Sequence, residues 1–357
     1  MLDDILLQAA WNLPAPLLSK AYFFHDVRVL CKTNHPAVLA IFGELLAIFP
    51  AVGRPRGEVS YSVLCYDHAS QFPVGLPRDR ERVGAVRLLT DTKLTYYRSR
   101  DHTTEYQRYT ALPPINEAGL SVIYPNHHVA LTQLERPERH QTTFLRRYVL
   151  LMALGQLIRS FGYEPCHAAA VTAPWDSQQG ALIVGESGSG KTTLSLGCAS
   201  TGYGLLGDDL ILLRASDGDG TIHAHTIMRE VAVRSGSLDL WHTLSFLRAL
   251  PADRRDKRYC AIERVWPGTT RFSAPIRLIL FPSLGAEKES RLAPLSKART
   301  LQELMNACLS RENAAQEKLF SLLSALVAQA HGYRLSIAQG ATDGPQMIRS
   351  LFTGGPP

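Results

Sequence analysis

The sequence has no closely spaced cysteines. Its six cysteines stand at positions 31, 65, 166, 198, 260 and 308, and Cys166 and Cys198 are the nearest pair. This wide spacing excludes CxxC-type metal or redox pairs and a dense disulfide framework. Unpaired thiols persist in reducing compartments, so we expect a cytoplasmic protein.

Long apolar runs and a leader pattern are also missing. The strongest apolar run, residues 148–158, is shorter than the roughly 20 residues that a membrane helix needs. Arginines flank it on both sides, which favours a buried helix of a soluble domain. The segment 1–13 carries Asp3 and Asp4 before its apolar residues and has no basic start, so we predict no signal peptide and no membrane segment.

Neither sign of charge dominates strongly. Apolar residues make up 45% and charged residues 20% of the chain, which is enough to fill a globular core. The net charge of +6 favours anionic partners such as nucleotides or acidic peptides. Basic residues are scattered and form no basic-and-aromatic motif, so we do not expect nucleic acid as a partner. A homo-oligomer stays open.

The expected elements indicate two domains and a tail. Residues 1–140 should form a mixed α+β N-terminal domain, with strands at 27–31, 59–66, 86–98 and 103–110, a helix at 36–49 and a hairpin of 120–124 with 128–132. Residues 141–353 begin with a helix at 144–162 and then alternate strands and helices, which is typical of an α/β domain. There we expect strands at 167–172, 181–184, 203–207, 276–281 and 333–337, and helices at 191–201, 296–308 and 315–330, the last ended by Gly332. Residues 354–357 should be a disordered tail.

One motif carries clear chemistry. Residues 185–192 read Gly-Glu-Ser-Gly-Ser-Gly-Lys-Thr and fill every fixed position of the phosphate-loop pattern GxxxxGK[ST]. Glycines let successive backbone N–H groups turn toward phosphate oxygens, and the positive end of the following helix then faces them. We therefore predict a nucleoside-triphosphate site made of Gly185, Glu186, Ser187, Gly188, Ser189, Gly190, Lys191, Thr192 and Thr193.

Four side chains then have expected roles around ATP and Mg²⁺. Lys191 should reach the β- and γ-phosphates, and the Thr192 hydroxyl should bind Mg²⁺. Asp208 and Asp209 end a short strand behind the loop, and ligands in open α/β sheets bind beyond such strand ends. Two adjacent carboxylates allow one to order the metal while the other accepts a proton from an attacking hydroxyl.

These residues resemble a known family. The stretch from Cys166-His167 through the loop to Gly207-Asp208-Asp209 is similar to the C-terminal catalytic domain of HPr serine kinase/phosphorylase, in the phosphoenolpyruvate-carboxykinase-like class of P-loop folds. That family has a His shortly before the loop, a loop of form GxSGxGK[ST], and a following Asp-Asp pair, usually after Ala instead of Gly. The resemblance implies an α/β P-loop kinase core in which Asp209 is the general base, Asp208 is a partner of the metal or of the hydrogen-bond network, and His167 flanks the active site.

The sequence differs from the bifunctional enzymes of this family in two respects. The Glu-Ile-Arg-Gly-Leu-Gly segment of the bifunctional enzymes has no counterpart, since the nearest residues are Met228-Arg229-Glu230. The first half also differs from their N-terminal domain. Both facts argue against phosphorylase activity and against HPr as the substrate. The better match is to HPr-kinase-related proteins of natural-product gene clusters, including those that phosphorylate a serine of lasso-peptide precursors.

Weaker signals concern basic residues. Arg229 and Arg234 lie where the family places phosphate-contacting cations, and such a cation neutralises transition-state charge; solvated arginines are the more common case. The run Asp-Arg-Arg-Asp-Lys-Arg at 253–258 is typical of a solvated loop, with a grip for an acidic peptide as the alternative.

The leading hypothesis is a kinase whose acceptor is a Ser or Thr hydroxyl of a small protein or precursor peptide, docked by residues 1–140. A small-molecule kinase on the same core stays open. An energy-coupling NTPase is disfavoured because the LSGGQ-like and NKxD motifs of transporter ATPases and GTPases are absent. A nucleotide sensor without turnover also stays open, although Lys191 and the paired aspartates argue against it.

Overall fold

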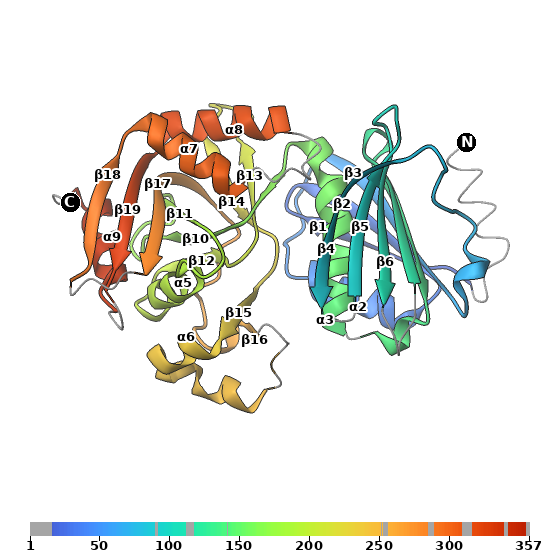
Figure 1. Ribbon diagram of the computed structural model, residues 1–357, viewed down its shortest axis with the longest axis horizontal. Coiled ribbons are helices and arrows are strands. Elements are labelled where there is room, and N and C mark those ends of the chain that lie inside the picture. The colour runs from blue at the N-terminus through green and yellow to red at the C-terminus, as the bar shows by residue number, and fades with distance from the viewer. Residues whose placement is uncertain are drawn as a thin grey trace. The chain divides into compact units, whose positions relative to one another are not determined.

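The computed structural model describes residues 16–89, 92–111, 118–140, 142–250, 252, 256–284, 289–308, 316–338 and 342–354 (Figure 1). The chain divides into two compact units, Met1–Tyr163 and Glu164–Pro357. Both contain strands and helices, so the fold is mixed α/β with several sheets. Of the tail expected to be disordered, residues 355–357 lie outside the described residues.

In the described part of the first unit, eight strands form one sheet in the order β1-β2-β3-β8-β7-β6-β5-β4. Their bounds are Leu18–Phe24, Val27–Thr33, Gly57–Tyr66, Glu81–Leu89, Thr92–Arg98, Glu105–Ala111, Ala118–Tyr124 and Val129–Glu135 for β1 to β8. Neighbours are antiparallel, except that β3 runs parallel to both β2 and β8. The crossover from β2 to β3 contains helix α2, Pro36–Leu46, which buries its apolar face.

Most of this unit agrees with the sequence prediction. The hairpin around Pro125-Asn126-His127 is confirmed, because β7 and β8 pair antiparallel. The single strand predicted at 86–98 is wrong, since β4 and β5 are two antiparallel strands. Both strands carry β-branched residues, so composition alone did not separate two strands from one long strand.

We expected the division between the units at residue 140, but it falls after Tyr163. The predicted helix is present and runs through α3 (Thr142–Phe144), a π-helical turn (Leu145–Leu150), α4 (Leu151–Leu157) and a 3-10 turn (Ile158–Phe161). Helix α4 contacts β7 and β8. The Val149 carbonyl accepts hydrogen bonds from the hydroxyls of Tyr61 (3.4 Å) and Tyr109 (3.5 Å). The helical segment therefore belongs to the first unit, whose sheet it covers.

The described part of the second unit has a mixed sheet of nine strands. Its path β12-β10-β11-β17-β14-β13-β9 branches at β17 to β19, which also pairs with β18. The bounds are Glu164–Cys166 (β9), Ala168–Thr172 (β10), Gly180–Val184 (β11), Gly204–Gly207 (β12), Ile211–Ala215 (β13), Ile222–Thr226 (β14), Ser273–Leu284 (β17), Arg291–Leu295 (β18) and His331–Ile337 (β19). Both β11 and β12 run antiparallel to β10. They therefore point the same way, and their carboxyl ends lie at one edge of the sheet.

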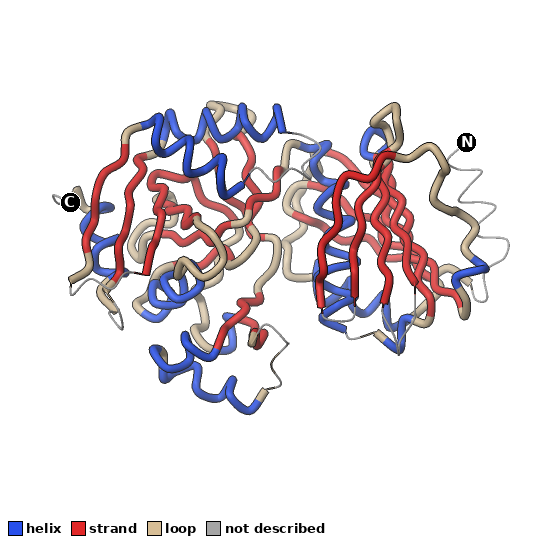
Figure 2. The backbone as a smooth tube through the Cα atoms, viewed as in Figure 1, coloured by secondary structure: helices blue, strands red, loops and turns tan. Residues whose placement is uncertain are grey.

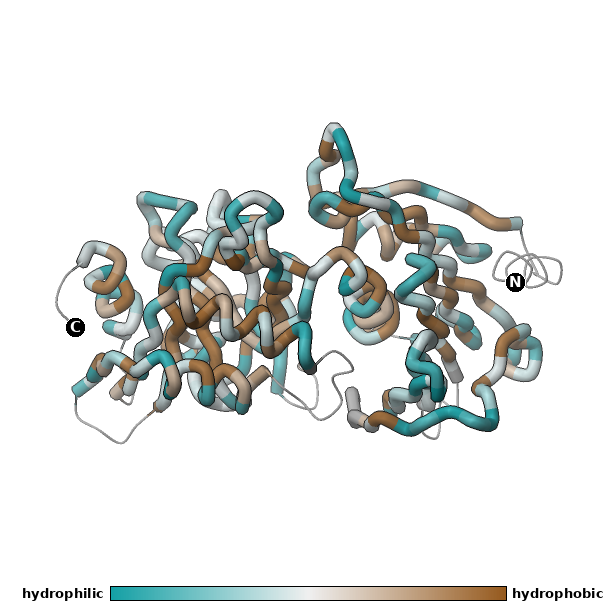
Figure 3. The backbone as a smooth tube through the Cα atoms, turned by 90° about the horizontal axis from the view of Figure 1, so that it is seen from above, coloured by the Kyte–Doolittle hydropathy of each residue, from teal (hydrophilic) through white to brown (hydrophobic). Residues whose placement is uncertain are grey.

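Helices cover both faces of this sheet (Figures 1 and 2). Helices α7 (Lys297–Cys308) and α8 (Gln316–Gln329) cover one face, and α5 (Lys191–Ser200) and α9 (Gly344–Phe352) cover the other. Because successive side chains of a strand point to opposite faces, alternate residues of β11 join the two different apolar cores. Figure 3 shows brown, hydrophobic stretches in the interior of each unit and teal, hydrophilic stretches in many of the outer loops.

A small lobe of the second unit stands beside this sheet, and we call residues 230–261 the hairpin lobe. It contains the antiparallel pair β15 (Glu230–Arg234) and β16 (Lys257–Ala261), with α6 (Ser235–Leu240) and a 3-10 segment (His242–Ala249) between them (Figure 1). Its buried leucines share a core with α5. A Cβ on Gly197 of α5 would lie 2.6 Å from Trp241 Cζ2, so only glycine allows this close packing.

The helices expected in this unit are present, but the residue predicted to end the helix at 315–330 lies in a strand. Helix α5 begins at Lys191 as predicted. Gly332, predicted to end a helix, instead lies inside β19. There a Cβ would come 2.1 Å from the Thr300 hydroxyl oxygen, so the glycine serves close packing of α7 on the strand.

The position of the division is testable with two truncated proteins. A chain that begins at Glu164 should unfold cooperatively, because the second unit has its own apolar cores. A chain that begins at Thr142 carries Phe144, Leu150 and Leu154 without the sheet that buries them, so it should bind a hydrophobic dye strongly and tend to aggregate. Thermal unfolding by circular dichroism and dye binding compare the two. Equal dye binding and equal melting temperatures would contradict a division after Tyr163.

Candidate active site

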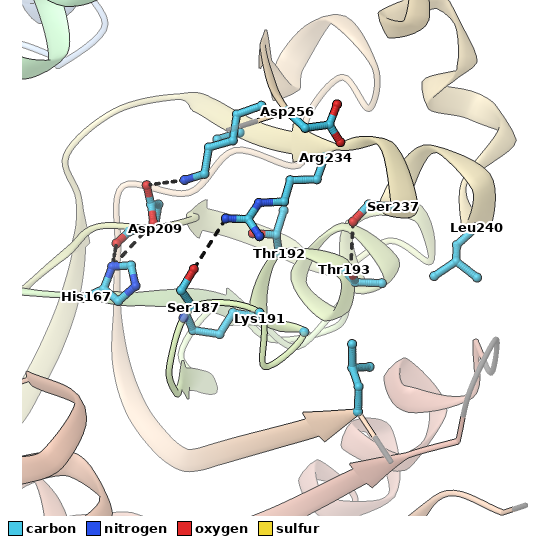
Figure 4. Close-up of a pocket in the computed structure, with 16 residues that line it drawn as sticks. His167, Ser187, Lys191, Thr192, Thr193, Asp209, Arg234, Ser237, Leu240 and Asp256 are labelled. Carbon is cyan, nitrogen blue, oxygen red and sulfur yellow. Dashed lines mark hydrogen bonds and ion pairs between the residues drawn. The ribbon is translucent and has the colours of Figure 1, made fainter. Parts of the chain in front are cut away.

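A cavity of about 640 Å³ opens beside the hairpin lobe of the second unit (Figure 4). Its lining comes from four places: the loop between β11 and α5 with the start of α5, the chain around the ends of β9 and β12, the end of β17, and the hairpin lobe. The lining residues are His167, Ser187, Gly188, Gly190, Lys191, Thr192, Thr193, Asp209, Ala232, Arg234, Gly236, Ser237, Leu240, Asp256, Lys257 and Leu284. Its volume falls in the range of roughly 300–1,000 Å³ that small-molecule sites occupy.

The glycine-rich loop connects a strand to a helix. It leaves β11, turns through 185–190 and enters α5 at Lys191. Gly188 and Gly190 have φ of 91° and 101°, a left-handed region that side chains disfavour. A Cβ on Gly185 would lie 2.7 Å from the Ser189 hydroxyl oxygen. Of the nine predicted loop residues, Gly185, Glu186 and Ser189 are not among those that line the cavity.

Lys191 is held against the loop. Its Nζ donates hydrogen bonds to the carbonyl oxygens of Gly185 (2.6 Å) and Glu186 (3.0 Å). Burial lowers the pKa of this ammonium, and the carboxylates of Asp209 and Asp208 oppose that shift. An ammonium has three donors, so exchanging a carbonyl for a phosphate oxygen would need little movement of the side chain.

Asp208 is buried directly behind Thr192. The Thr192 hydroxyl lies 2.9 Å and 3.0 Å from the two carboxylate oxygens and donates to them. Burial, and then the neighbouring charge of Asp209, raise the pKa of Asp208 to about 6. A hydroxyl and a carboxylate are hard oxygen ligands, and Mg²⁺ in nucleotide sites typically takes one or two such ligands besides phosphate and water. The pair therefore fits a nucleotide-bound Mg²⁺. The described residues contain no cluster of three or more His, Cys, Asp or Glu side chains that could hold a metal by themselves.

Asp209 has an unusual backbone conformation, with φ of 77°. This left-handed turn costs free energy for a residue other than glycine. His167 Nδ1 lies 2.8 Å from the Asp209 carbonyl oxygen and 3.5 Å from Oδ1 of its carboxylate, and Oδ2 lies 3.2 Å from Lys257 Nζ (Figure 4). Asp208 and Asp209 are thus adjacent in sequence but differ in environment, one buried behind Thr192 and the other lining the cavity.

His167 lies at the same end of the cavity. Because a carbonyl oxygen only accepts, Nδ1 must carry the proton of the bond to Asp209, and Nε2 is then the acceptor of the neutral ring. Partial desolvation, and then the charge of Lys191, lower the pKa of His167, which favours the neutral ring. Its side chain is still 45% exposed, which leaves it accessible to a ligand.

The structure separates the basic residues that the sequence grouped together. Arg234 lines the cavity, and its Nη2 lies 3.5 Å from the Ser187 hydroxyl oxygen. Arg229 is not a lining residue, and its guanidinium lies over the Phe272 ring instead. Lys257 belongs to the run 253–258, of which residues 253–255 lie outside the described residues, and it lines the cavity beside Asp209. Sequence analysis missed Lys257 because no motif marks it.

Ser237 was missed for the same reason. Its hydroxyl oxygen lies 2.9 Å from that of Thr193 on the first turn of α5. This contact fixes α6 of the hairpin lobe against the loop, so the lobe forms a wall of the cavity.

The buried carboxylate gives a stability prediction. The pKa of Asp208 is higher in the folded protein than its ordinary value of 3.8, so between pH 4 and 6 the folded state retains a proton that the unfolded state releases. Stability from this group therefore falls as the pH rises through that window. Asp208→Asn should raise the free energy of unfolding at pH 7.5 by at most about 3 kcal/mol, and the gain should vanish at pH 4. Urea unfolding at both pH values is the measurement.

The matched control is Asp239→Asn, which removes an exposed carboxylate of the hairpin lobe and should change stability little at either pH. If Asp208→Asn were less stable than the wild type at pH 7.5, the carboxylate would be stabilising and the assignment of a raised pKa would be wrong.

Comparisons with known proteins add little to this geometry. No protein-family model matches the sequence, and no curated protein matches it. Among solved structures, the chain is similar to the Hpr(Ser) kinase/phosphatase from Coxiella burnetii, with a TM-score of 0.30 and 12% sequence identity. The similarity covers 54% of this chain and 89% of that chain. A TM-score this low carries no argument about fold or function.

Proposed function

We propose that this protein is an ATP- and Mg²⁺-dependent kinase that transfers the γ-phosphate to a hydroxyl group. One arrangement carries the proposal: a loop of phosphate-binding form, Thr192 and the Asp209 carboxylate line one cavity, and Asp208 is buried directly behind Thr192. Phosphoryl transfer needs placement and charge neutralisation more than covalent help. These groups supply both.

The arrangement also favours one orientation of a bound nucleotide. In Figure 4, His167 and Asp209 lie at one end of the cavity and Leu240 at the other, with Lys191 and Thr192 between them. A triphosphate on the loop would then point its γ-phosphate toward Asp209 and its nucleoside toward Leu240. The acceptor hydroxyl would enter beside His167.

Thr192 and Asp208 would hold the Mg²⁺, which would neutralise charge on the β- and γ-phosphates. The raised pKa of Asp208 suits this role. Burial destabilises its charged carboxylate, and a bound cation would stabilise that charge. Lys191 would exchange its bonds to loop carbonyls for bonds to phosphate oxygens.

Asp209 would act as the general base. A carboxylate within about 2.6–3.2 Å of a hydroxyl accepts its proton as the bond to phosphorus forms. The hydrogen bond that His167 donates to the Asp209 carbonyl fixes the turn that presents the carboxylate to the cavity. His167 would also shape the acceptor end through its exposed ring.

We propose a Ser or Thr of a small protein or precursor peptide as the acceptor, as in lasso-peptide pathways, and a cytoplasmic setting. The first unit supports this choice, because a peptide needs a docking surface beyond the catalytic cavity, whereas a metabolite does not. An assay that compares phosphate transfer to peptides, phosphate transfer to metabolites and release of free phosphate tests this proposal. It distinguishes a peptide kinase from a small-molecule kinase, an NTPase or a nucleotide sensor.

Within the described residues, no helix is long and apolar enough to cross a membrane.

The loop assignment predicts a binding defect. Lys191→Ala removes charge-assisted contacts worth about 1.5–3 kcal/mol, so the Kd of a non-hydrolysable ATP analogue with Mg²⁺ should rise about 10- to 100-fold. Isothermal titration calorimetry measures it, and Lys318→Ala, an exposed lysine of α8, is the control. Unchanged affinity in Lys191→Ala would show that the nucleotide binds elsewhere.

The base assignment predicts a defect in transfer alone. Asp209→Asn keeps the shape of the side chain and removes its charge, so ATP binding should persist while transfer falls about 10²–10⁴-fold. Transfer of labelled phosphate to a serine-containing peptide panel and to metabolites is compared with release of free phosphate. Rapid release with no labelled acceptor would favour an NTPase, and transfer at the wild-type rate in Asp209→Asn would remove the base assignment.

A further inference from the structure

We propose that Lys257 is a second catalytic cation, which contacts the transferred phosphoryl group from the side opposite the glycine-rich loop. This inference rests on the proposed function and extends it to a residue of the hairpin lobe that no sequence motif marks. Three properties of Lys257 support it: the element that carries it, its distance to Asp209, and its charge.

Lys257 enters the site from a separate element. It begins β16, whereas Lys191, Thr192 and Asp208 come from the loop, α5 and the end of β12. Its side chain is 18% exposed and lines the cavity. Figure 4 shows the lobe residues Arg234 and Asp256 on one side of the cavity and Ser187 and Lys191 on the other.

Its distance to Asp209 places it beside the reacting atoms. Lys257 Nζ lies 3.2 Å from Asp209 Oδ2. An acceptor hydroxyl that gives its proton to Asp209 must lie about 2.6–3.2 Å from that carboxylate. The phosphoryl group that this hydroxyl attacks would therefore lie near the Lys257 side chain. Arg234 is more exposed, and its guanidinium contacts Ser187 of the loop instead.

Its charge acts on the other ionisable groups of the site. Burial is the largest cause of the lowered pKa values of Lys191 and His167, and the positive charge of Lys257 adds to both shifts. Lys257 is thus close enough to influence ionisable groups that the sheet part of the unit contributes to the cavity. Lys191 lies at the loop carbonyls, so the two ammonium groups would approach a triphosphate from different sides.

In the step that we infer, a lone pair of the acceptor hydroxyl attacks the γ-phosphorus. The bond from phosphorus to the bridging oxygen breaks, and its electron pair stays on the β-phosphate of ADP. The hydroxyl proton moves to Asp209. Lys257 keeps its proton and donates a hydrogen bond to a peripheral oxygen of the phosphoryl group, whose charge is spread over three such oxygens in the transition state.

The test compares binding of MgADP with binding of MgADP plus aluminium fluoride, which mimics the phosphoryl group in transfer. Full-length wild type, Lys257→Met and Lys257→Arg are measured beside Arg248→Met, a lobe arginine paired with Asp239 outside the cavity. In Lys257→Met, affinity for MgADP alone should change less than about threefold, whereas the gain from aluminium fluoride should fall about 10²-fold. Lys257→Arg should recover at least part of that gain, and Arg248→Met should match the wild type.

Thermal unfolding checks that each variant is folded, and Lys257→Gln replaces Lys257→Met if the latter is not. A full aluminium fluoride gain in folded Lys257→Met or Lys257→Gln would overturn the role of Lys257 and leave the proposed function standing. An equal loss of affinity with and without aluminium fluoride would also overturn it, because the residue would then serve ground-state binding or structure. A wild type with no gain would overturn the proposed function together with this inference.

Discussion

The candidate site depends on the hydrogen bond between the Thr192 hydroxyl and the buried Asp208 carboxylate. It joins the first turn of α5 to the end of β12, two elements that reach the same sheet edge because both β11 and β12 run antiparallel to β10. Burying an acid there is unfavourable, as its raised pKa indicates. Natural proteins accept such costs mainly at functional sites. The next residue, Asp209, adds a second cost through its left-handed backbone.

The cavity is lined by residues from both the sheet edge and the hairpin lobe. The sheet supplies a loop, a hydroxyl and two carboxylates, and the lobe supplies Lys257 and Arg234. Contacts between Thr193 and Ser237 and between Lys257 and Asp209 fix the two sides of the cavity relative to each other. Since a phosphoryl group in transfer carries charge on several oxygens, cations from two directions neutralise it better than cations from one.

The first unit differs from the second in how it buries polar groups. Hydroxyls of Tyr61, Ser121 and Thr132 form a buried network under the π-helical turn. Such a network favours one packing of the helix over others only when its members are satisfied. It explains why residues 142–161 stay with the first sheet, although their apolar pattern alone would allow them to pack on either unit.

Local sequence was sufficient to predict a glycine-rich turn before α5, the start of α5, and a short strand before Asp208 and Asp209, because neighbouring residues set glycine conformation, helix starts and strand periodicity. Turn residues likewise predicted the hairpin of β7 and β8. Packing against distant residues was needed to split residues 86–98 into two strands, to place residues 142–161 and to put Gly332 in a strand, since in each case the local pattern fits two arrangements. Lys257 illustrates the same limit at the site. A lysine in a charged run acquires its position beside Asp209 through the pairing of β16 with β15, a long-range contact that no local pattern encodes.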